Sequence, residues 1–202
     1  PTGTPPVAHH YGVLDAAFTP DGRMLACCGG RPHLELCDAV TGQRVEEYNS
    51  AHTAWPLAMA LSRDGSSLAT VANDGIVLLW DLTDRPMRST MTGHQGPIEC
   101  VTFAPDGRLL ATGGTDNTIR IWDVGTKRQV TILRGHQAPV EWVVFLGDGE
   151  TLVSGGLDRS VKVWTVAPRS DAHVLTGHAE WVEAVAFSPD GRTLVSVDYG
   201  GF

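Results

Sequence analysis

Three groups of side chains in the sequence contain the residue types of a catalytic triad. Each group has a histidine, a serine or threonine 18 residues later, an aspartate four residues further on and a tryptophan after another six. The groups are His52, Thr70, Asp74 and Trp80; His94, Thr112, Asp116 and Trp122; and His136, Ser154, Asp158 and Trp164. A hydroxyl, an imidazole and a carboxylate together can perform nucleophilic hydrolysis, but an enzyme needs one such site. Three copies are typical of a structural element, so we expect these side chains to stabilise the fold.

The spacing of the groups reflects a repeat of 42 residues, since His52, His94, His136 and His178 follow one another at that interval. A unit of this size is too small to bury its own core, so neighbouring units must bury one another. The sequence therefore predicts a single domain over residues 1–202. Its units are 8–50, 51–92, 93–134, 135–176 and a shorter last unit, 177–202.

Each unit is expected to contain four short strands and no helix. In the unit 93–134 the predicted strands are 97–103, 109–113, 118–123 and 128–133. They are rich in β-branched residues and separated by turn residues such as Asp106-Gly107. The last unit offers two strands, 181–187 and 193–197, and its residues from Asp198 onward fall where a turn is expected. The fold class predicted is all-β.

The pattern of Gly-His, then Trp-Asp about 28 residues later, with an Asp six residues before the Trp, resembles the WD40 family over essentially the whole chain. The resemblance implies a β-propeller in which each unit is a blade. It also implies that the His, Ser/Thr, Asp and Trp of each unit form a hydrogen-bonded network inside the blade. We expect four complete blades and a partial fifth, as a fragment of a larger ring. The alternative is that several copies share one ring or pair edge to edge.

The first unit departs from this pattern, because Cys27, Arg31 and Cys37 replace the Ser/Thr, Asp and Trp, although His9 remains. We expect buried thiols, with a cross-strand disulfide between Cys27 and Cys37 as the alternative. The four cysteines of the chain show no metal-ligand or disulfide spacing. Reduced cysteines predict a cytoplasmic, intracellular protein.

Composition argues against several classes of function. The formal net charge is −8 with 15 Lys and Arg, which disfavours a nucleic-acid partner or a membrane surface. No apolar run reaches the roughly 18 residues that span a bilayer. The sequence has neither a phosphate-binding loop nor metal-ligand spacing, and each Asp-Gly turn offers one carboxylate, too few for calcium. We therefore expect no cofactor and no metal.

The resemblance places partner binding on the face that carries the Gly-His loops. There it exposes the third and fifth residues after each histidine and the residue before the network aspartate. We call eight such residues the rim: Trp55, Asn73, Glu99, Thr115, Glu141, Leu157, Trp181 and Glu183. Their glutamates favour a basic protein or peptide. The alternative is that the glutamates serve solubility and the tryptophans pack between loops.

The function predicted is a non-catalytic scaffold for protein–protein interaction. A second hypothesis is a sensor or regulatory module within a larger signalling protein, such as a kinase or a nucleotide-binding switch protein. A third, from another class, is an enzyme that uses the propeller channel as its active site.

Overall fold

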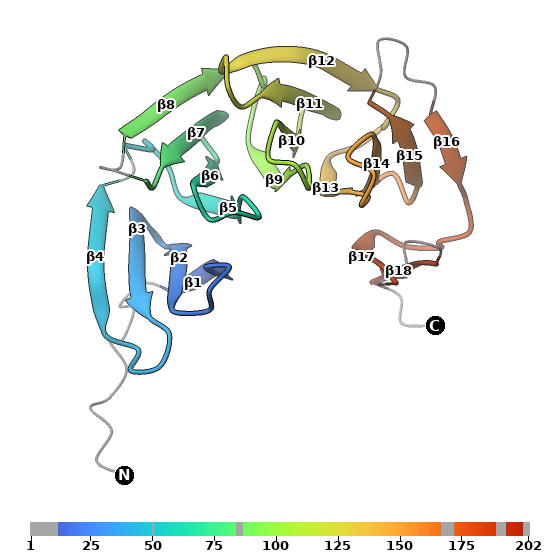
Figure 1. The fold of residues 1–202 in the computed structure, drawn as a ribbon. Helices are drawn as coiled ribbons and strands as arrows, with labels where there is room; N and C mark the ends of the chain where they lie inside the picture. The colour runs from blue at the N-terminus through green and yellow to red at the C-terminus, as the bar shows by residue number, and fades with distance from the viewer. Residues whose placement is uncertain (1–11, 50, 84–86, 167–171, 189–192, 200–202) are drawn as a thin grey trace.

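The computed structural model describes residues 12–49, 51–83, 87–166, 172–188 and 193–199. These residues form β-strands and turns without a helix, so none of them belongs to a helix that could span a membrane. The strands make four antiparallel sheets of four strands and one of two, arranged as blades of an open arc (Figure 1). The predicted all-β propeller, with four complete blades and a partial fifth, is confirmed.

The blades follow the chain in order, and in each four-stranded blade the first strand lies innermost and the fourth outermost (Figure 1). Blade one contains β1 (Val13–Phe18), β2 (Met24–Gly29), β3 (Arg31–Asp38) and β4 (Arg44–Asn49). Blade two contains β5 (Pro56–Leu61), β6 (Ser67–Ala72), β7 (Ile76–Asp81) and β8 (Met87–Thr92). Blade three contains β9 (Ile98–Phe103), β10 (Leu109–Gly114), β11 (Thr118–Asp123) and β12 (Arg128–Arg134). Blade four contains β13 (Val140–Phe145), β14 (Thr151–Gly156), β15 (Val161–Thr165) and β16 (Ala172–Leu175). Blade five contains β17 (Val182–Phe187) and β18 (Leu194–Asp198).

The strand boundaries fall within a residue of the expected ones. One assignment was wrong: Asp198 is the last residue of β18 and not part of a turn, because it pairs with Val182 of β17. Each sheet lies inside one of the five repeat units. The arc does not close into a ring over the described residues, and blades one and five lie on either side of its opening (Figure 1).

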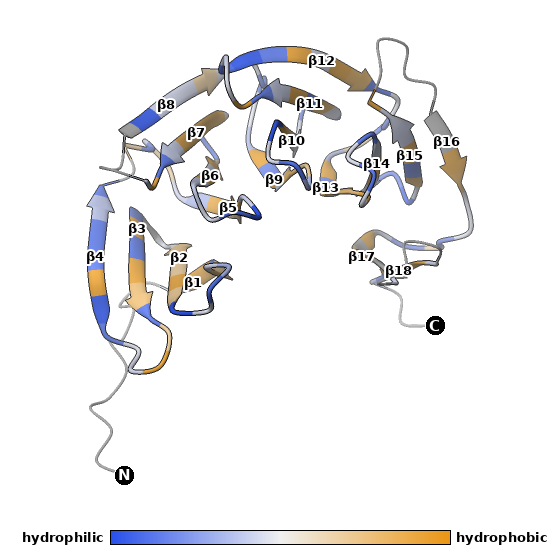
Figure 2. Cartoon of the chain, in the orientation of Figure 1, coloured by the Kyte–Doolittle hydropathy of each residue, from blue (hydrophilic) through white to orange (hydrophobic). Residues whose placement is uncertain are grey.

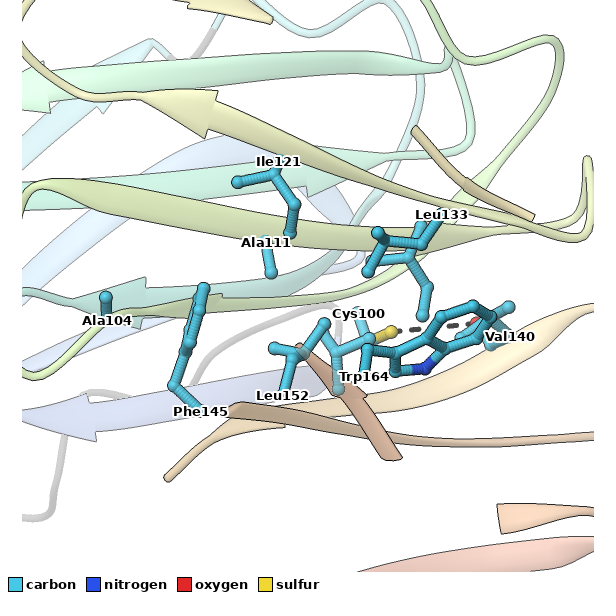
Figure 3. Close-up of a cluster of buried hydrophobic side chains, with 11 residues drawn as sticks. Cys100, Ala104, Ala111, Ile121, Leu133, Val140, Phe145, Leu152 and Trp164 are labelled. Carbon is cyan, nitrogen blue, oxygen red and sulfur yellow. Dashed lines mark hydrogen bonds between the residues drawn. The ribbon is translucent and has the colours of Figure 1, made fainter. Parts of the chain in front are cut away.

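The hydrophobic core lies between neighbouring blades. The middle strands β10 and β11 are buried along most of their length, whereas β4 is largely exposed and hydrophilic (Figure 2). Figure 3 shows the junction of blades three and four, where Leu133 and Cys100 of one blade meet Val140 and Trp164 of the next. The Cys100 thiol donates to the Val140 carbonyl there, with sulfur and oxygen 3.6 Å apart. Each blade therefore needs its neighbour, as the small repeat unit requires.

Blade one packs against blade two through buried apolar side chains. Leu34 and Cys28 join Trp80 of blade two in one buried cluster. Cys27 and Cys37 are buried free thiols, so the disulfide alternative does not hold in this structure. The pairing explains this, because Cys37 lies opposite Leu25 and Cys27 lies opposite Glu35. Burial raises the pKa of Cys27 to about 11 and that of Cys28 to about 12, so both stay protonated at neutral pH.

Candidate functional site

A chain of hydrogen bonds joins the four network side chains of blade three. The Trp122 indole nitrogen donates to the Thr112 hydroxyl oxygen at 2.9 Å, and that oxygen lies 2.9 Å from His94 Nε2. His94 Nδ1 lies 3.0 Å from Asp116. One proton arrangement satisfies every group: Nδ1 donates to the carboxylate, and Nε2 accepts from the hydroxyl, which in turn accepts from the indole.

The same geometry recurs in blades two and four. His52 Nε2 lies 3.0 Å from Thr70 Oγ1, and His136 Nε2 lies 2.7 Å from Ser154 Oγ. The indole nitrogens of Trp80 and Trp164 donate to the same hydroxyls at 3.1 and 2.8 Å. The remaining imidazole nitrogens lie 3.1 Å from Asp74 and 2.8 Å from Asp158.

These networks are inaccessible to a substrate. Thr70, Thr112 and Ser154 are fully buried, and each hydroxyl is already shared between an imidazole and an indole. Burial lowers the pKa of His52, His94 and His136, which keeps the imidazoles neutral at physiological pH. Burial alone would raise the pKa of Asp116, but hydrogen bonds from Thr118 and Gln95 together with His94 lower it to about 2.

The network aspartates attach the Gly-His loops to the blades. Asp116 accepts the backbone N–H of Gln95, which follows His94, at 3.0 Å. It also accepts the hydroxyl of Thr118, at the start of β11, at 2.7 Å. The Asp116 carboxylate therefore fixes the loop before β9 to the turn before β11. Asp158 makes the equivalent bond to Gln137 at 2.9 Å. The buried network thus positions the loops of the rim.

Backbone hydrogen bonds place the rim residues in pairs. The amide of Asn73 donates to the Trp55 carbonyl at 3.3 Å, and the amide of Tyr199 donates to the Trp181 carbonyl at 3.0 Å. In blades three and four, Thr115 and Leu157 donate in the same way to Pro97 and Pro139, both at 2.9 Å. Each of blades two to five therefore presents one side chain from the loop before its first strand beside one from the turn after its second strand.

The rim glutamates occupy β-bulges in the inner strands. In β9 the pairing of Ile98 with Gly114 is followed by that of Cys100 with Gly113, so Glu99 is the extra residue. Glu141 holds the same place in β13, between the pairings of Val140 and Trp142. A bulged residue leaves the regular ladder and its side chain is re-aimed. Glu183 falls at the equivalent point of β17, but its side chain lies outside the described part of the structure.

Glu99 and Glu141 are half-buried and close enough to interact. Burial raises the pKa of Glu99, and burial together with the charge of Glu99 raises the pKa of Glu141. A raised pKa means that each carboxylate is destabilised as an anion by its surroundings. A cation placed beside them would relieve that cost.

The rim tryptophans point largely into solvent, since 60% of Trp55 and 51% of Trp181 is exposed. They are therefore available for contact, whereas Thr115 and Leu157 are half-buried. Exposed aromatic side chains beside carboxylates form a surface suited to binding. In blade one, the retained His9 and the side chain of Arg31, which replaces the network aspartate, lie outside the described part of the structure.

Blade five contains a further network, which was not predicted from the sequence. His178 Nε2 lies 2.6 Å from Ser196 Oγ, and His178 Nδ1 lies 3.1 Å from Asp198. Ser196 follows His178 by 18 residues, as in the other units, but Asp198 stands only two residues after the hydroxyl instead of four. The regular His-to-Ser spacing is the signal that could have revealed it.

Two aromatic residues of the same face were missed as well. Tyr199 is 42 residues after Leu157, so the repeat alone assigns it to the rim. Trp142 follows the bulged Glu141, and 42% of its surface is exposed. The equivalent residue of the preceding repeat, Cys100, is buried. Among the described residues no three His, Cys, Asp or Glu side chains are arranged to hold a metal ion.

A family model described as "WD domain, G-beta repeat" matches residues 4–31, 42–81, 86–123, 127–165 and 169–201, which is most of the chain. The chain belongs to the WD40 repeat family. Individual curated proteins match about half of this chain, at 28–32% identity. Nuclear distribution protein nudF of Emericella nidulans is 28% identical over 98 residues, which cover 48% of this chain and 22% of that protein.

Nuclear distribution protein PAC1-2 of Uncinocarpus reesii and nuclear distribution protein PAC1 of Arthroderma benhamiae are each 32% identical over 109 residues. These matches cover 49% of this chain, 24% of the first protein and 23% of the second. The WD40 chain thus spans about a quarter of the length of the curated relatives it matches.

Proposed function

We propose that this WD40 chain is a non-catalytic scaffold whose rim binds a basic segment of a partner protein or peptide. The observation that carries the proposal is the combination of exposed Trp55 and Trp181 with the half-buried carboxylates of Glu99 and Glu141. Aromatic anchors supply contact area, and the carboxylates supply charge complementarity for lysine or arginine.

The buried networks support a structural role for the residues that resemble a catalytic triad. Their hydroxyls are fully buried and already hydrogen-bonded, so they offer no nucleophile to a substrate. Membership of a repeat family whose blades present loops also favours binding over catalysis. The proposal places the protein in the cytoplasm, because buried free thiols at all four cysteines favour a reducing compartment.

A pair of isosteric substitutions on the rim tests the proposal. The variant with Glu99→Gln and Glu141→Gln removes two rim charges, and a control variant with Glu46→Gln and Glu150→Gln removes two exposed charges elsewhere. Fluorescence anisotropy measures the affinity of each protein for a peptide rich in arginine and lysine. We expect the rim variant to bind about tenfold more weakly than the wild type and the control to bind like the wild type. Equal affinity of the two variants would refute the proposal.

A further inference from the structure

A groove of about 390 Å³ lies where blades four and five meet on the rim side. It is lined by Glu141, Trp142, Leu157, Trp181, Val182 and Tyr199. Its size is at the lower end of the range for ligand pockets and suits one long side chain rather than a folded domain. Blade four contributes one carboxylate and one indole, and blade five contributes two aromatic rings.

The walls of the groove are aromatic on both sides. The rings of Trp181 and Tyr199 lie with centroids 6.1 Å apart at an angle of 37°, and their backbones are hydrogen-bonded to each other. Tyr199 has 72% of its surface exposed, and Trp142 is partly exposed on the side of blade four. Such rings bind apolar stems and attract cations to their faces.

The aromatic walls are particular to this junction. The residues 42 positions before Trp142, Trp181 and Tyr199 are Cys100, Pro139 and Leu157. At that earlier junction Cys100 is buried and its thiol donates to the Val140 carbonyl of the next blade (Figure 3). The junction of blades three and four therefore has none of these three aromatic rings at the equivalent positions and can be compared with the aromatic one.

Glu141 gives the groove its charge. It occupies the bulge of β13, is half-buried, and forms no ion pair with any Lys or Arg among the described residues. The charge of Glu99 adds to the cost of keeping Glu141 ionised. A cationic side chain in the groove would supply the missing counter-charge while its stem contacts the rings.

We propose that the groove between blades four and five binds a single arginine side chain of the partner, with Glu141 pairing the guanidinium and Trp142, Trp181 and Tyr199 enclosing it. Arginine fits better than lysine because the planar guanidinium stacks on aromatic rings and pairs with a carboxylate through two parallel hydrogen bonds. This inference rests on the proposed function, since it names the group that the rim takes from a basic partner.

The test uses N-acetyl-arginine methylamide as the probe and the tryptophan indole N–H signals in ¹H–¹⁵N NMR spectra as the readout. We expect the signals of Trp142 and Trp181 to shift in a saturable way, while that of Trp55 does not. The citrulline analogue, which has the same shape without the charge, should cause no such shift. Equal shifts with citrulline, or equal affinity for the lysine analogue, would overturn the assignment.

Two variants locate the site. Glu141→Gln should weaken probe binding about tenfold through loss of the ion pair, and Trp181→Ala should weaken it to a similar degree. Val130→Ala, which shortens an exposed side chain of the outer strand β12 outside the rim, should leave the affinity unchanged. Unchanged affinity in both groove variants would overturn the inference.

The arginine- and lysine-rich peptide separates a failure of this inference from a failure of the proposed function. Suppose that the peptide has equal affinity for the wild type and both groove variants, but lower affinity for the Glu99→Gln variant. The rim then binds basic partners, and the groove is not the arginine site. If the peptide does not bind the wild type, the proposed function itself fails.

Discussion

A single buried hydroxyl connects the two aromatic rings of each complete blade network. In blade three the oxygen of Thr112 accepts the Trp122 indole N–H and serves His94 Nε2, both at 2.9 Å. No water can replace it, because Thr112 is fully buried. The cost of removing this hydroxyl is therefore the cost of leaving both an indole and an imidazole nitrogen unsatisfied in the core.

We predict that Thr112→Val, which keeps the shape and removes the hydroxyl, lowers the free energy of unfolding by about 2–3 kcal/mol. The melting temperature should fall by roughly 4–12 °C for a chain of this size. Urea and thermal unfolding followed by circular dichroism measure both. Thr131→Val on the outer strand β12 is the matched control and should change stability little. If the two variants were equally stable, the network would contribute nothing to the blade.

The fifth blade has two described strands, whereas each of the other blades has four. Blade four buries β14 between β13 and β15, whereas β18 pairs only with β17 among the described residues. The His178 network also lacks a tryptophan within the described range, and His178 is half-buried where His136 is buried. A two-stranded hairpin is marginally stable by itself, so blade five depends on its contact with blade four.

We predict that the amides of β17 and β18 exchange with solvent faster than those of β13 and β14. The two pairs of strands are equivalent in the repeat, so each serves as the control for the other. Hydrogen–deuterium exchange with mass spectrometry of the native protein measures the difference. The reason is local opening of blade five, which breaks fewer contacts than opening of blade four. Equal protection of the two hairpins would show that the whole arc opens as one unit.

The fold was predictable from the sequence because the repeat period, the turn residues and the strand pattern all indicate the same architecture. The 42-residue period, the Asp-Gly turns and the alternating strands all indicate four-stranded blades, and the structure confirms them. The bulges at Glu99 and Glu141 were not predictable, because a bulge is a property of the register between two strands. The groove depends on how Trp142 meets Trp181 across a blade junction, which no single repeat reveals.

At the scale of the whole molecule, the three complete networks make stability depend on pH. Burial lowers the pKa of His52, His94 and His136 below the ordinary value of 6.5. As the pH falls through 6.5, the unfolded chain takes up protons at these histidines before the folded chain does. The contribution of these neutral histidines to the free energy of unfolding is therefore complete above the unfolded pKa, and it decreases as the pH falls toward the folded pKa.

We predict that the free energy of unfolding decreases from pH 7.5 to pH 5.5, and decreases again below about pH 4. The second loss reflects Asp116, whose folded pKa of about 2 lies below the unfolded value, so its contribution is lost as the pH falls toward 2. Urea unfolding at half-unit intervals of pH measures the profile. A flat profile, or greater stability at pH 5.5 than at pH 7.5, would contradict the assignment of neutral, buried histidines.

The open arc exposes apolar side chains at both of its ends. Phe18 of β1 has 63% of its surface exposed in blade one, and Val195 and Val197 are exposed on β18 in blade five. The outer side of β18 carries no further strand among the described residues. Exposed apolar residues beside an unpaired strand edge favour association with another chain.

We predict that the 202-residue chain self-associates as its concentration rises, through blade five of one copy and blade one of another. The two surfaces differ, so the contact is head-to-tail and continues to add copies until a ring closes or a filament forms. Sedimentation velocity should therefore show species larger than a dimer. Phe18→Ser combined with Val195→Ser should shift the distribution toward the monomer, whereas Val40→Ser, in an exposed turn of blade one, should not. A monomer at every concentration would show that these ends do not bind each other.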